Sequence, residues 1–330
     1  MTTEIAPVTP TGVHLGLLTP GTPEWDAARS GLTVTATEIA AVVGLSPWMS
    51  RFTLWHKKAG LPTPAFEASP AMRWGGRFED DVAEEFGEQH PEFIFVDAGT
   101  WRHRGRPWQR ATPDRLLAPV CGCGLHRPDC CDPEDCGPCC PDCPTCPTQG
   151  VRAAELLEIK TSLFGDDWAD GLPVHYRCQV MWQLDTLGLS RARVALLILS
   201  GLEYREYEIE YDAEEAAFLR GEARAFLDSV AAGQRPPIDS AADTYQTVRA
   251  QHEGRDDIEV QIPAALAERY EAAGAAQKAA EEERRQAAAE VLDAIGTGRW
   301  ATDPTGRRIA QRTTANSLTP CKPPKKGDSL

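Results

Sequence analysis

The sequence contains no run of about eighteen apolar residues, the length that a membrane-spanning helix requires. Its first residues, MTTEIAPVTPTG, also lack the basic segment followed by an apolar segment that marks a secretory signal peptide. These two absences predict a cytoplasmic protein with no membrane partner. The 330 residues are enough for one large domain or two smaller ones.

Basic residues are fewer than acidic ones: the sequence has 34 Lys and Arg against 49 Asp and Glu, which gives a net charge of -15. This balance argues against an indiscriminate polyanion binder, since neutralising phosphates requires clustered Lys and Arg. It does not exclude a local basic surface, and a site that holds divalent cations is itself acidic. One basic segment is present, WRHRGRPWQR at 101–110, which fits an exposed hairpin as well as a nucleic-acid contact.

Cysteine is scarce outside one segment, 121–146, which holds nine of the eleven cysteines. In a cytosolic chain such density indicates metal binding rather than disulfides. The nine thiols and one histidine could form two tetrahedral zinc sites, whereas a single iron–sulfur cluster would use only about four of them, which favours zinc. With few apolar residues, the segment is expected to fold only with metal. The candidate zinc ligands are Cys121, Cys123, His126, Cys130, Cys131, Cys136, Cys139, Cys140, Cys143 and Cys146.

Hydrophobic periodicity and turn residues predict alternating helices and strands. Helices are expected after the capping residues Thr22, Thr35 (with Glu38 at capping-box spacing), Ser50 and Asp212, and over 70–89 and 174–189. The helix at 70–89 is predicted from an apolar stripe of one residue in every four: Trp74, Phe78, Val82 and Phe86. Strands are expected at 93–101, 108–114, 155–162, 193–200 and 204–211. This order predicts an α/β (α+β) fold with a mixed central sheet flanked by helices.

Composition divides the chain into four parts. We expect a flexible arm at 1–20 and a main domain at 21–240, interrupted by the cysteine-rich insert at 121–146. A helical extension at 241–315 would contain a long helix or helical hairpin over 263–295 and a small β-hairpin around 303–306. The tail at 316–330 is expected to be disordered.

The segment LLEIKTS, 156–162, places two charged residues within a strand. Glu158 and Lys160 point to one face and Leu157 and Ile159 to the other, because side chains alternate along a strand. Asp114 lies at the end of the preceding predicted strand. Two carboxylates on neighbouring strands can hold Mg²⁺, and a lysine beside them can orient or deprotonate a water. The alternative is a solvated ion pair on a half-exposed strand.

Four sequence blocks, in order, resemble the lambda-exonuclease family, the YqaJ-like viral recombinases of the PD-(D/E)xK nuclease superfamily. They are WDAARSGLTVTATEIA, AMRWGGRFEDDVAEEF, QRATPDRLL with LLEIKTS, and YRCQVMWQLDTLG, and they span roughly 25–200. The resemblance implies a restriction-endonuclease-like PD-(D/E)xK core. The cysteine-rich insert departs from the family pattern and is either a zinc-held loop or a contact for DNA or a partner.

The resemblance also implies a metal centre. Asp114 and Glu158 would bind Mg²⁺ or Mn²⁺, together with the backbone carbonyl of Ile159, and Lys160 would act on the nucleophile. Glu79 would be an auxiliary acidic ligand or would position a water; alone, it reads as a solvated helix carboxylate.

Further residues would hold the substrate on the same resemblance. Gln179 would orient Lys160 or a bound nucleotide, and Gln183 lies one helical turn later on the same face. Arg29 and Thr37 would grip a 5′ terminal phosphate, for which the planar guanidinium is suited. The simpler interpretations are a surface charge for Arg29 and an ordinary first-turn residue for Thr37.

The family resemblance implies a metal-dependent double-stranded DNA exonuclease. It would resect ends 5′ to 3′ for a single-strand annealing protein in phage-type recombination, and it would self-associate, with a ring as one arrangement. If a phage encodes it, it would work in the host cytoplasm. Two alternatives remain at this stage: an endonuclease acting at internal sites, and a zinc-organised DNA-binding or scaffold protein without catalysis.

Overall fold

The computed structural model describes residues 7–120, 151–252 and 254–321. The ten candidate zinc ligands between 121 and 146 therefore lie outside the described residues. Contacts divide the chain into two units, Met1–Gly254 and Arg255–Leu330. In the described part, no helix combines the length and apolar character needed to cross a membrane.

A mixed five-stranded sheet forms the centre of the first unit, as the element order predicts. Strands β9 and β10 run parallel, and the other neighbouring pairs run antiparallel. Across the sheet, the order is β11 (Glu203–Glu210), β10 (Arg191–Ile198), β9 (Glu155–Ser162), β7 (Arg115–Pro119) and β4 (Phe93–Asp97). Strand β9 covers the LLEIKTS segment and lies in the middle.

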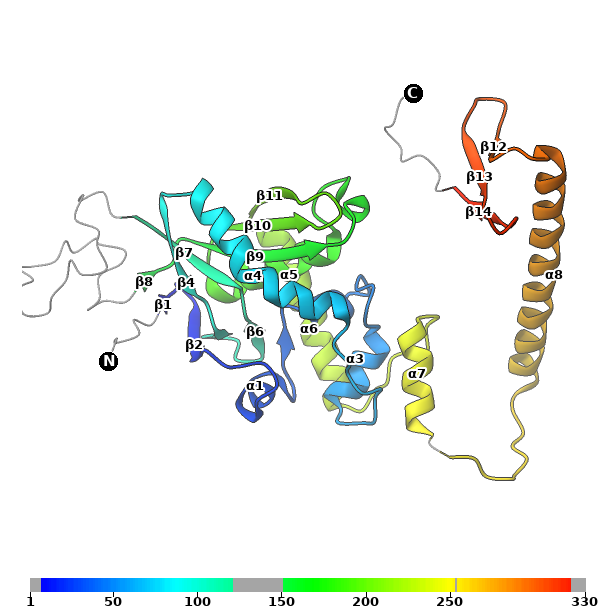
Figure 1. The fold of residues 1–330 in the computed structure, drawn as a ribbon. Coiled ribbons are helices and arrows are strands. Elements are labelled where there is room, and N and C mark those ends of the chain that lie inside the picture. Colours follow the sequence, from blue (N-terminus) through cyan, green and yellow to red (C-terminus); the bar gives the residue numbers. More distant parts are fainter. Residues whose placement is uncertain (1–6, 121–150, 253, 322–330) are drawn as a thin grey trace, which may run out of the picture. The chain divides into compact units, whose positions relative to one another are not determined.

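Helix α4 (Pro70–Gln89) covers one face of this sheet. Its predicted apolar stripe buries Val82 and Phe86 against Leu157 and Ile159 of β9. At the other end of the stripe, Trp74 is half exposed. Figure 1 shows α4 lying across β9. Because Leu157 and Ile159 pack with the buried residues of α4, the apolar side of LLEIKTS is the side that faces this helix.

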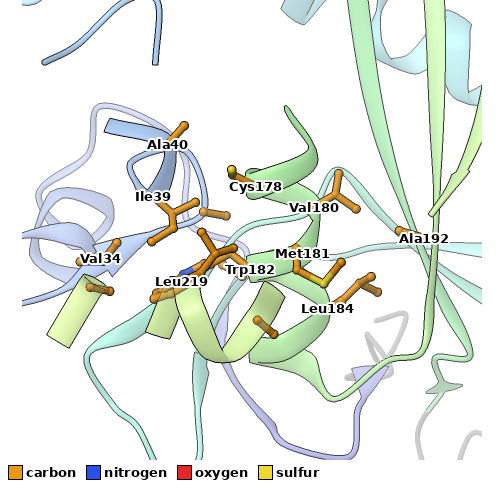
Figure 2. Packing of buried hydrophobic residues seen from close by; sticks show 14 of the residues in the cluster. Val34, Ile39, Ala40, Cys178, Val180, Met181, Trp182, Leu184, Ala192 and Leu219 are labelled. Atoms are coloured by element: carbon orange, nitrogen blue, oxygen red, sulfur yellow. The ribbon is translucent and has the colours of Figure 1, made fainter. Parts of the chain in front are cut away.

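The main hydrophobic core of the unit surrounds α5 (Val174–Leu187). Residues Cys178–Leu187 are all buried, so this helix contacts protein on every side. Trp182 packs in one cluster with Ile39 of α2 (Ile39–Val42) and Leu219 of α6 (Ala213–Ala231) (Figure 2). The side chains of α5 that face β9 are consequently held rigidly.

A second, four-stranded sheet has the order β2 (Gly12–Gly16), β5 (Thr100–His103), β6 (Gln109–Ala111) and β3 (Val34–Thr35). The basic segment 101–110 forms its β5–β6 hairpin, but the hairpin is not a freely exposed one. Trp101 is buried, and Arg106 forms an ion pair with Asp185 of α5 at 2.9 Å. Two short strands, β1 (Pro7–Val8) and β8 (Val151–Arg152), pair separately.

Three predicted helix caps are confirmed: Thr22, Ser50 and Asp212 accept backbone N–H groups at the starts of α1 (Pro23–Arg29), α3 (Arg51–Lys58) and α6. The prediction for Thr35 is wrong in part, because the helix α2 begins only at Ile39. The Glu38 carboxylate accepts the Thr35 N–H at 3.0 Å, but Thr35 itself pairs with β6 as part of β3.

Helix α7 (Ala242–Gln251) belongs to the first unit, whereas the sequence analysis placed 241–315 in one extension. The reason is a polar contact with α3: Thr244 Oγ1 donates to Ser50 Oγ at 2.7 Å, and the Thr53 and Thr247 hydroxyls lie 2.8 Å apart. The second unit has one continuous helix, α8 (Ala264–Ile295), and an antiparallel β-meander of β12 (Trp300–Thr302), β13 (Arg308–Arg312) and β14 (Leu318–Pro320). A short 3-10 helix, η1 (Asp166–Trp168), precedes α5.

Candidate active site

Glu158 is the most enclosed charged residue of the predicted centre, with only 2% of its surface exposed. Its Oε1 accepts hydrogen bonds from the Lys160 ammonium and the Gln179 amide. Its Oε2 accepts from Gln183 Nε2 at 2.6 Å. Because Gln179 and Gln183 are one helical turn apart on α5, both amides reach the same carboxylate. The charged face of LLEIKTS is thus covered by α5 rather than solvated.

Asp114 lies beside this carboxylate. The prediction that it ends a strand is wrong, because β6 stops at Ala111. Asp114 directly precedes β7, in the link through which the chain passes from β6 in one sheet to β7 in the other. Pro113 has no N–H to donate to the β6 ladder, which explains why the earlier strand stops short of it. Asp114 Oδ2 accepts the Ile159 N–H at 2.6 Å, so it is fixed directly against β9.

The two carboxylates and the lysine influence each other strongly. Burial raises the pKa of Asp114 well above its usual range, and the nearby charge of Glu158 raises it further. Burial alone would lower the pKa of Lys160, but the charges of Glu158 and Asp114 outweigh it and leave that pKa raised. Lys160 is therefore protonated in this arrangement. It could accept a proton only where added positive charge offsets the two carboxylates.

Glu79, on α4, lies close enough for its charge to contribute to the raised pKa of Asp114. Its Oε1 accepts from Arg115 Nη1 at 2.9 Å. Arg115 also forms ion pairs with Asp80 and, at 3.4 Å, with Asp97. Glu79 is thus at the edge of the centre and shares an arginine that is adjacent in sequence to Asp114.

The donor set fits a hard divalent cation. Asp114 and Glu158 offer carboxylate oxygens, and the strand that carries Ile159 adds a backbone carbonyl. Mg²⁺ is usually held by one or two carboxylates and keeps several waters, so it does not need a full protein cage. Within 7–120, 151–252 and 254–321, no three His, Cys, Asp or Glu side chains gather as a ready-made site. By its chemistry, a pair of carboxylates suits Mg²⁺ or Mn²⁺, which prefer oxygen ligands, better than a structural zinc, which takes four Cys or His ligands.

Arg29 and Thr37 form a second group. Arg29 Nη2 donates to Thr37 Oγ1 at 3.0 Å, and its guanidinium lies over the Trp25 ring at 4.4 Å. Burial lowers the pKa of Arg29. In the described part of the chain, no carboxylate lies within ion-pair distance of this guanidinium, so the cation has capacity for an external anion.

Two residues that sequence reasoning missed support this second group. Lys58 Nζ forms an ion pair with Glu38 Oε2 at 2.8 Å and donates to the Arg29 carbonyl at 3.0 Å. The Lys58 and Glu38 side chains are only 2% and 8% exposed. No local signal distinguishes Lys58 from the exposed Lys57 before it, since both follow an apolar helix segment. Gln183, in contrast, was visible from its spacing to Gln179.

The fold and the site together define a mixed α/β protein with a centre made of Glu158 and Lys160 on β9 and of Asp114, which directly precedes the neighbouring strand β7. The model of the YqaJ-like viral recombinase domain matches residues 24–190, half of the chain, and the protein belongs to this family. The family resemblance drawn from the four sequence blocks is thereby confirmed.

Individual relatives are more distant. The chain is 26% identical over 220 residues to the uncharacterized protein YqaJ of Bacillus subtilis, an alignment that spans 64% of this chain and 58% of that protein. Among solved structures it is similar to the alkaline exonuclease LHK-Exo of Laribacter hongkongensis in complex with dAMP, at 19% identity and a TM-score of 0.47, over 64% of this chain and 94% of the other. A phage-related exonuclease of Haemophilus somnus is similar at 10% identity and a TM-score of 0.40, over 61% and 96%.

Proposed function

We propose that the protein is a Mg²⁺-dependent or Mn²⁺-dependent exonuclease that resects double-stranded DNA ends, 5′ to 3′, for recombination by strand annealing. The observation that carries the proposal is the pair of Asp114 and the buried Glu158, with Lys160 on the same strand as Glu158. Membership of a viral recombinase family supports the biological setting.

The chain's own residues account for the steps of phosphodiester hydrolysis. Asp114 is held by the Ile159 N–H just before β7, and Glu158 is held by two amides on the neighbouring strand β9, so both present fixed oxygens. A bound Mg²⁺ would supply charge neutralisation for the phosphate and lower the pKa of the attacking water. Lys160 would orient that water, and it could accept the proton only as the neutral amine, after losing its own proton to solvent; positive charge that offsets its carboxylate neighbours would favour that loss by lowering the lysine pKa. Gln179 acts as a positioning residue through Glu158, whose oxygen it shares with Lys160.

The proposed polarity of resection rests on the family resemblance, and the group of Arg29 and Thr37 is consistent with it. Arg29 and Thr37 offer a guanidinium and a hydroxyl that already lie 3.0 Å apart, a combination that suits a terminal phosphate. We therefore expect an end-dependent enzyme rather than an endonuclease.

Digestion of five DNA substrates tests this proposal. The substrates are a closed circular duplex and linear duplexes that carry a label at the 5′ or the 3′ end, with and without a 5′ phosphate. We expect Mg²⁺-dependent release of the 5′ label first, faster with the phosphate, and an intact circle. Cutting of the circle would favour the endonuclease, and first release of the 3′ label would reverse the polarity. Asp114→Asn is the inactive control.

The same proposal includes an annealing partner, self-association of the nuclease, and zinc as a structural metal. A single-strand annealing protein would receive the resected strand, and self-association of the nuclease would keep it on DNA; sedimentation with and without DNA measures the latter. The ten candidate ligands at 121–146 predict about two or more zinc ions per chain, retained in mild EDTA that removes Mg²⁺. Elemental analysis that finds iron instead would show that the metal is wrong.

A further inference from the structure

The second unit contains a polar cavity that no part of the proposed mechanism uses. It has a volume of about 600 Å³ and lies between the end of α8 and the β-meander. Such a volume falls in the range of small-ligand sites, about 300 to 1,000 Å³. Most of its lining residues are exposed, so it is an open surface site that an extended ligand could cross.

The residues that line this cavity are basic or uncharged, and none of them is acidic. The lining consists of the guanidinium groups of Arg299 and Arg312, the amides of Gln311 and Asn316, three threonines and one glycine. No carboxylate and no large apolar side chain is among these lining residues. Hydrogen-bond donors and positive charge without acids fit an anion. The lack of an aromatic or aliphatic anchor argues against a protein segment, since such anchors dominate protein interfaces.

Backbone and side-chain contacts hold the arginines in place. The Arg312 N–H donates to the Arg299 carbonyl at 2.9 Å, which sets the two residues side by side where β12 and β13 pair. Arg312 also donates to the Gly296 carbonyl and, at 3.3 Å, to Asn316 Oδ1. An arginine has five N–H donors, so these contacts orient Arg312 and leave further donors for a ligand.

Trp300 extends the basic surface beyond the cavity. The Arg299 and Arg308 guanidinium groups lie over its ring at 5.0 and 4.2 Å. In the described part of the chain, neither guanidinium has a carboxylate at ion-pair distance. Arg307, in contrast, is neutralised by Asp303 at 2.9 Å. Although the net charge of the protein is -15, the meander therefore presents three arginines whose charge no described carboxylate neutralises: Arg299, Arg308 and Arg312.

We propose that this surface, formed by Arg299, Arg308 and Arg312 together with the cavity that Arg299 and Arg312 line, binds the phosphodiester backbone of DNA as a second contact separate from the catalytic centre. Guanidinium groups pair with phosphate oxygens, and hydroxyl and amide groups supply the additional donors typical of backbone contacts. Bound arginines displace condensed counterions, so the contact adds affinity without sequence preference. The choice of DNA over other polyanions rests on the proposed function.

The test compares two matched double variants of the full chain. Arg299→Gln/Arg308→Gln removes two charges from the proposed surface, and Arg284→Gln/Arg285→Gln removes two exposed charges from α8 in the same unit. Binding of fluorescent single-stranded and duplex oligonucleotides is measured by anisotropy in EDTA, over a series of salt concentrations. Thermal unfolding shows that each variant folds.

We expect the first variant to bind DNA on the order of tenfold more weakly at low salt. The slope of log affinity against log salt should shrink by about one to two, as each lost phosphate contact contributes about 0.7 to 0.9. The α8 variant should match the wild type. A larger loss on single strands would identify the resected product as the ligand, and a larger loss on duplex would identify the substrate.

Equal DNA affinity in the two variants would overturn the proposal. So would unchanged DNA binding together with lost binding of a labelled poly-glutamate peptide, which would indicate an acidic protein partner instead. The proposed function is judged separately, by hydrolysis of saturating DNA in Mg²⁺, which the first variant should retain. A wild type that binds DNA through this surface but does not hydrolyse it would refute the nuclease and leave this inference standing.

Discussion

Replacing Lys58 by methionine tests the physical logic of the Arg29 group. The substitution keeps the length of the side chain but removes the charge that pairs with Glu38 at 2.8 Å and the N–H that reaches the Arg29 carbonyl at 3.0 Å. Burial raises the pKa of Glu38, but Lys58 and the Thr35 N–H outweigh it, so that this pKa is lowered in the protein. In Lys58→Met the carboxylate stays buried with only the Thr35 N–H as its donor.

The expected cost is large, because both side chains are nearly inaccessible to water. Removing one partner of such a pair typically destabilises a protein by about 3 to 5 kcal/mol, whereas replacing both by apolar residues is often neutral. Urea unfolding of the first unit should therefore show a midpoint lowered by more than about 1 M in Lys58→Met. Lys57→Met, at the exposed neighbouring position, should stay within about 0.5 kcal/mol of the wild type.

The double variant Lys58→Met/Glu38→Leu decides whether the reasoning is right. It should recover most of the lost stability, since no uncompensated charge remains. The stability of the wild type should also depend on pH through Glu38. Because its pKa is lowered on folding, Glu38 stabilises the folded state above its unfolded pKa, and this contribution is lost as pH falls through the folded pKa. A single variant as stable as Lys57→Met, or a double variant no better than Lys58→Met, would refute the buried ion pair as the support of Arg29.

Three further predictions concern the centre and its surroundings. Lys160→Ala should lower the hydrolysis rate on the order of 10² to 10⁴ in single-turnover assays with DNA binding retained, and Lys160→Arg should not restore it, because a guanidinium cannot accept a proton. Asp114→Asn should raise the melting temperature in EDTA, because it removes the charge repulsion with Glu158 that helps raise the pKa of Asp114. The same substitution should abolish the stabilisation that Mg²⁺ gives the wild type. A lower melting temperature of the variant in EDTA would contradict this prediction. Burial lowers the pKa of His90, but its bonds to two glutamates, Glu206 among them at 2.8 Å, leave that pKa raised. The resulting stabilisation is present below the unfolded pKa and is lost as pH rises through the folded pKa, so His90→Gln should flatten the stability profile above the unfolded pKa of histidine, as measured by urea unfolding at several pH values.

Local signals in the sequence determined much of the fold. The bounds of α4 and β9 were predicted from an apolar stripe of period four and from alternating residues, and Thr22, Ser50 and Asp212 cap the helices that they were expected to cap. These features lie within a few residues of each other, so the physics that produces them is present in short segments. The residue types and order of Asp114, Glu158 and Lys160 likewise carried the family resemblance.

Only the tertiary structure decided the surroundings of those residues. Glu158 reads as a half-exposed strand residue until α5 covers it with Gln179 and Gln183. Thr35 has the spacing of a helix cap, yet pairing with β6 holds it in a strand. Lys58 and Lys57 are indistinguishable in sequence, and only the position of Glu38 makes one of them a buried ion pair. In each case the deciding partner lies on another element, and burial and charge pairing depend on which faces meet in space rather than on the neighbouring residues of the chain.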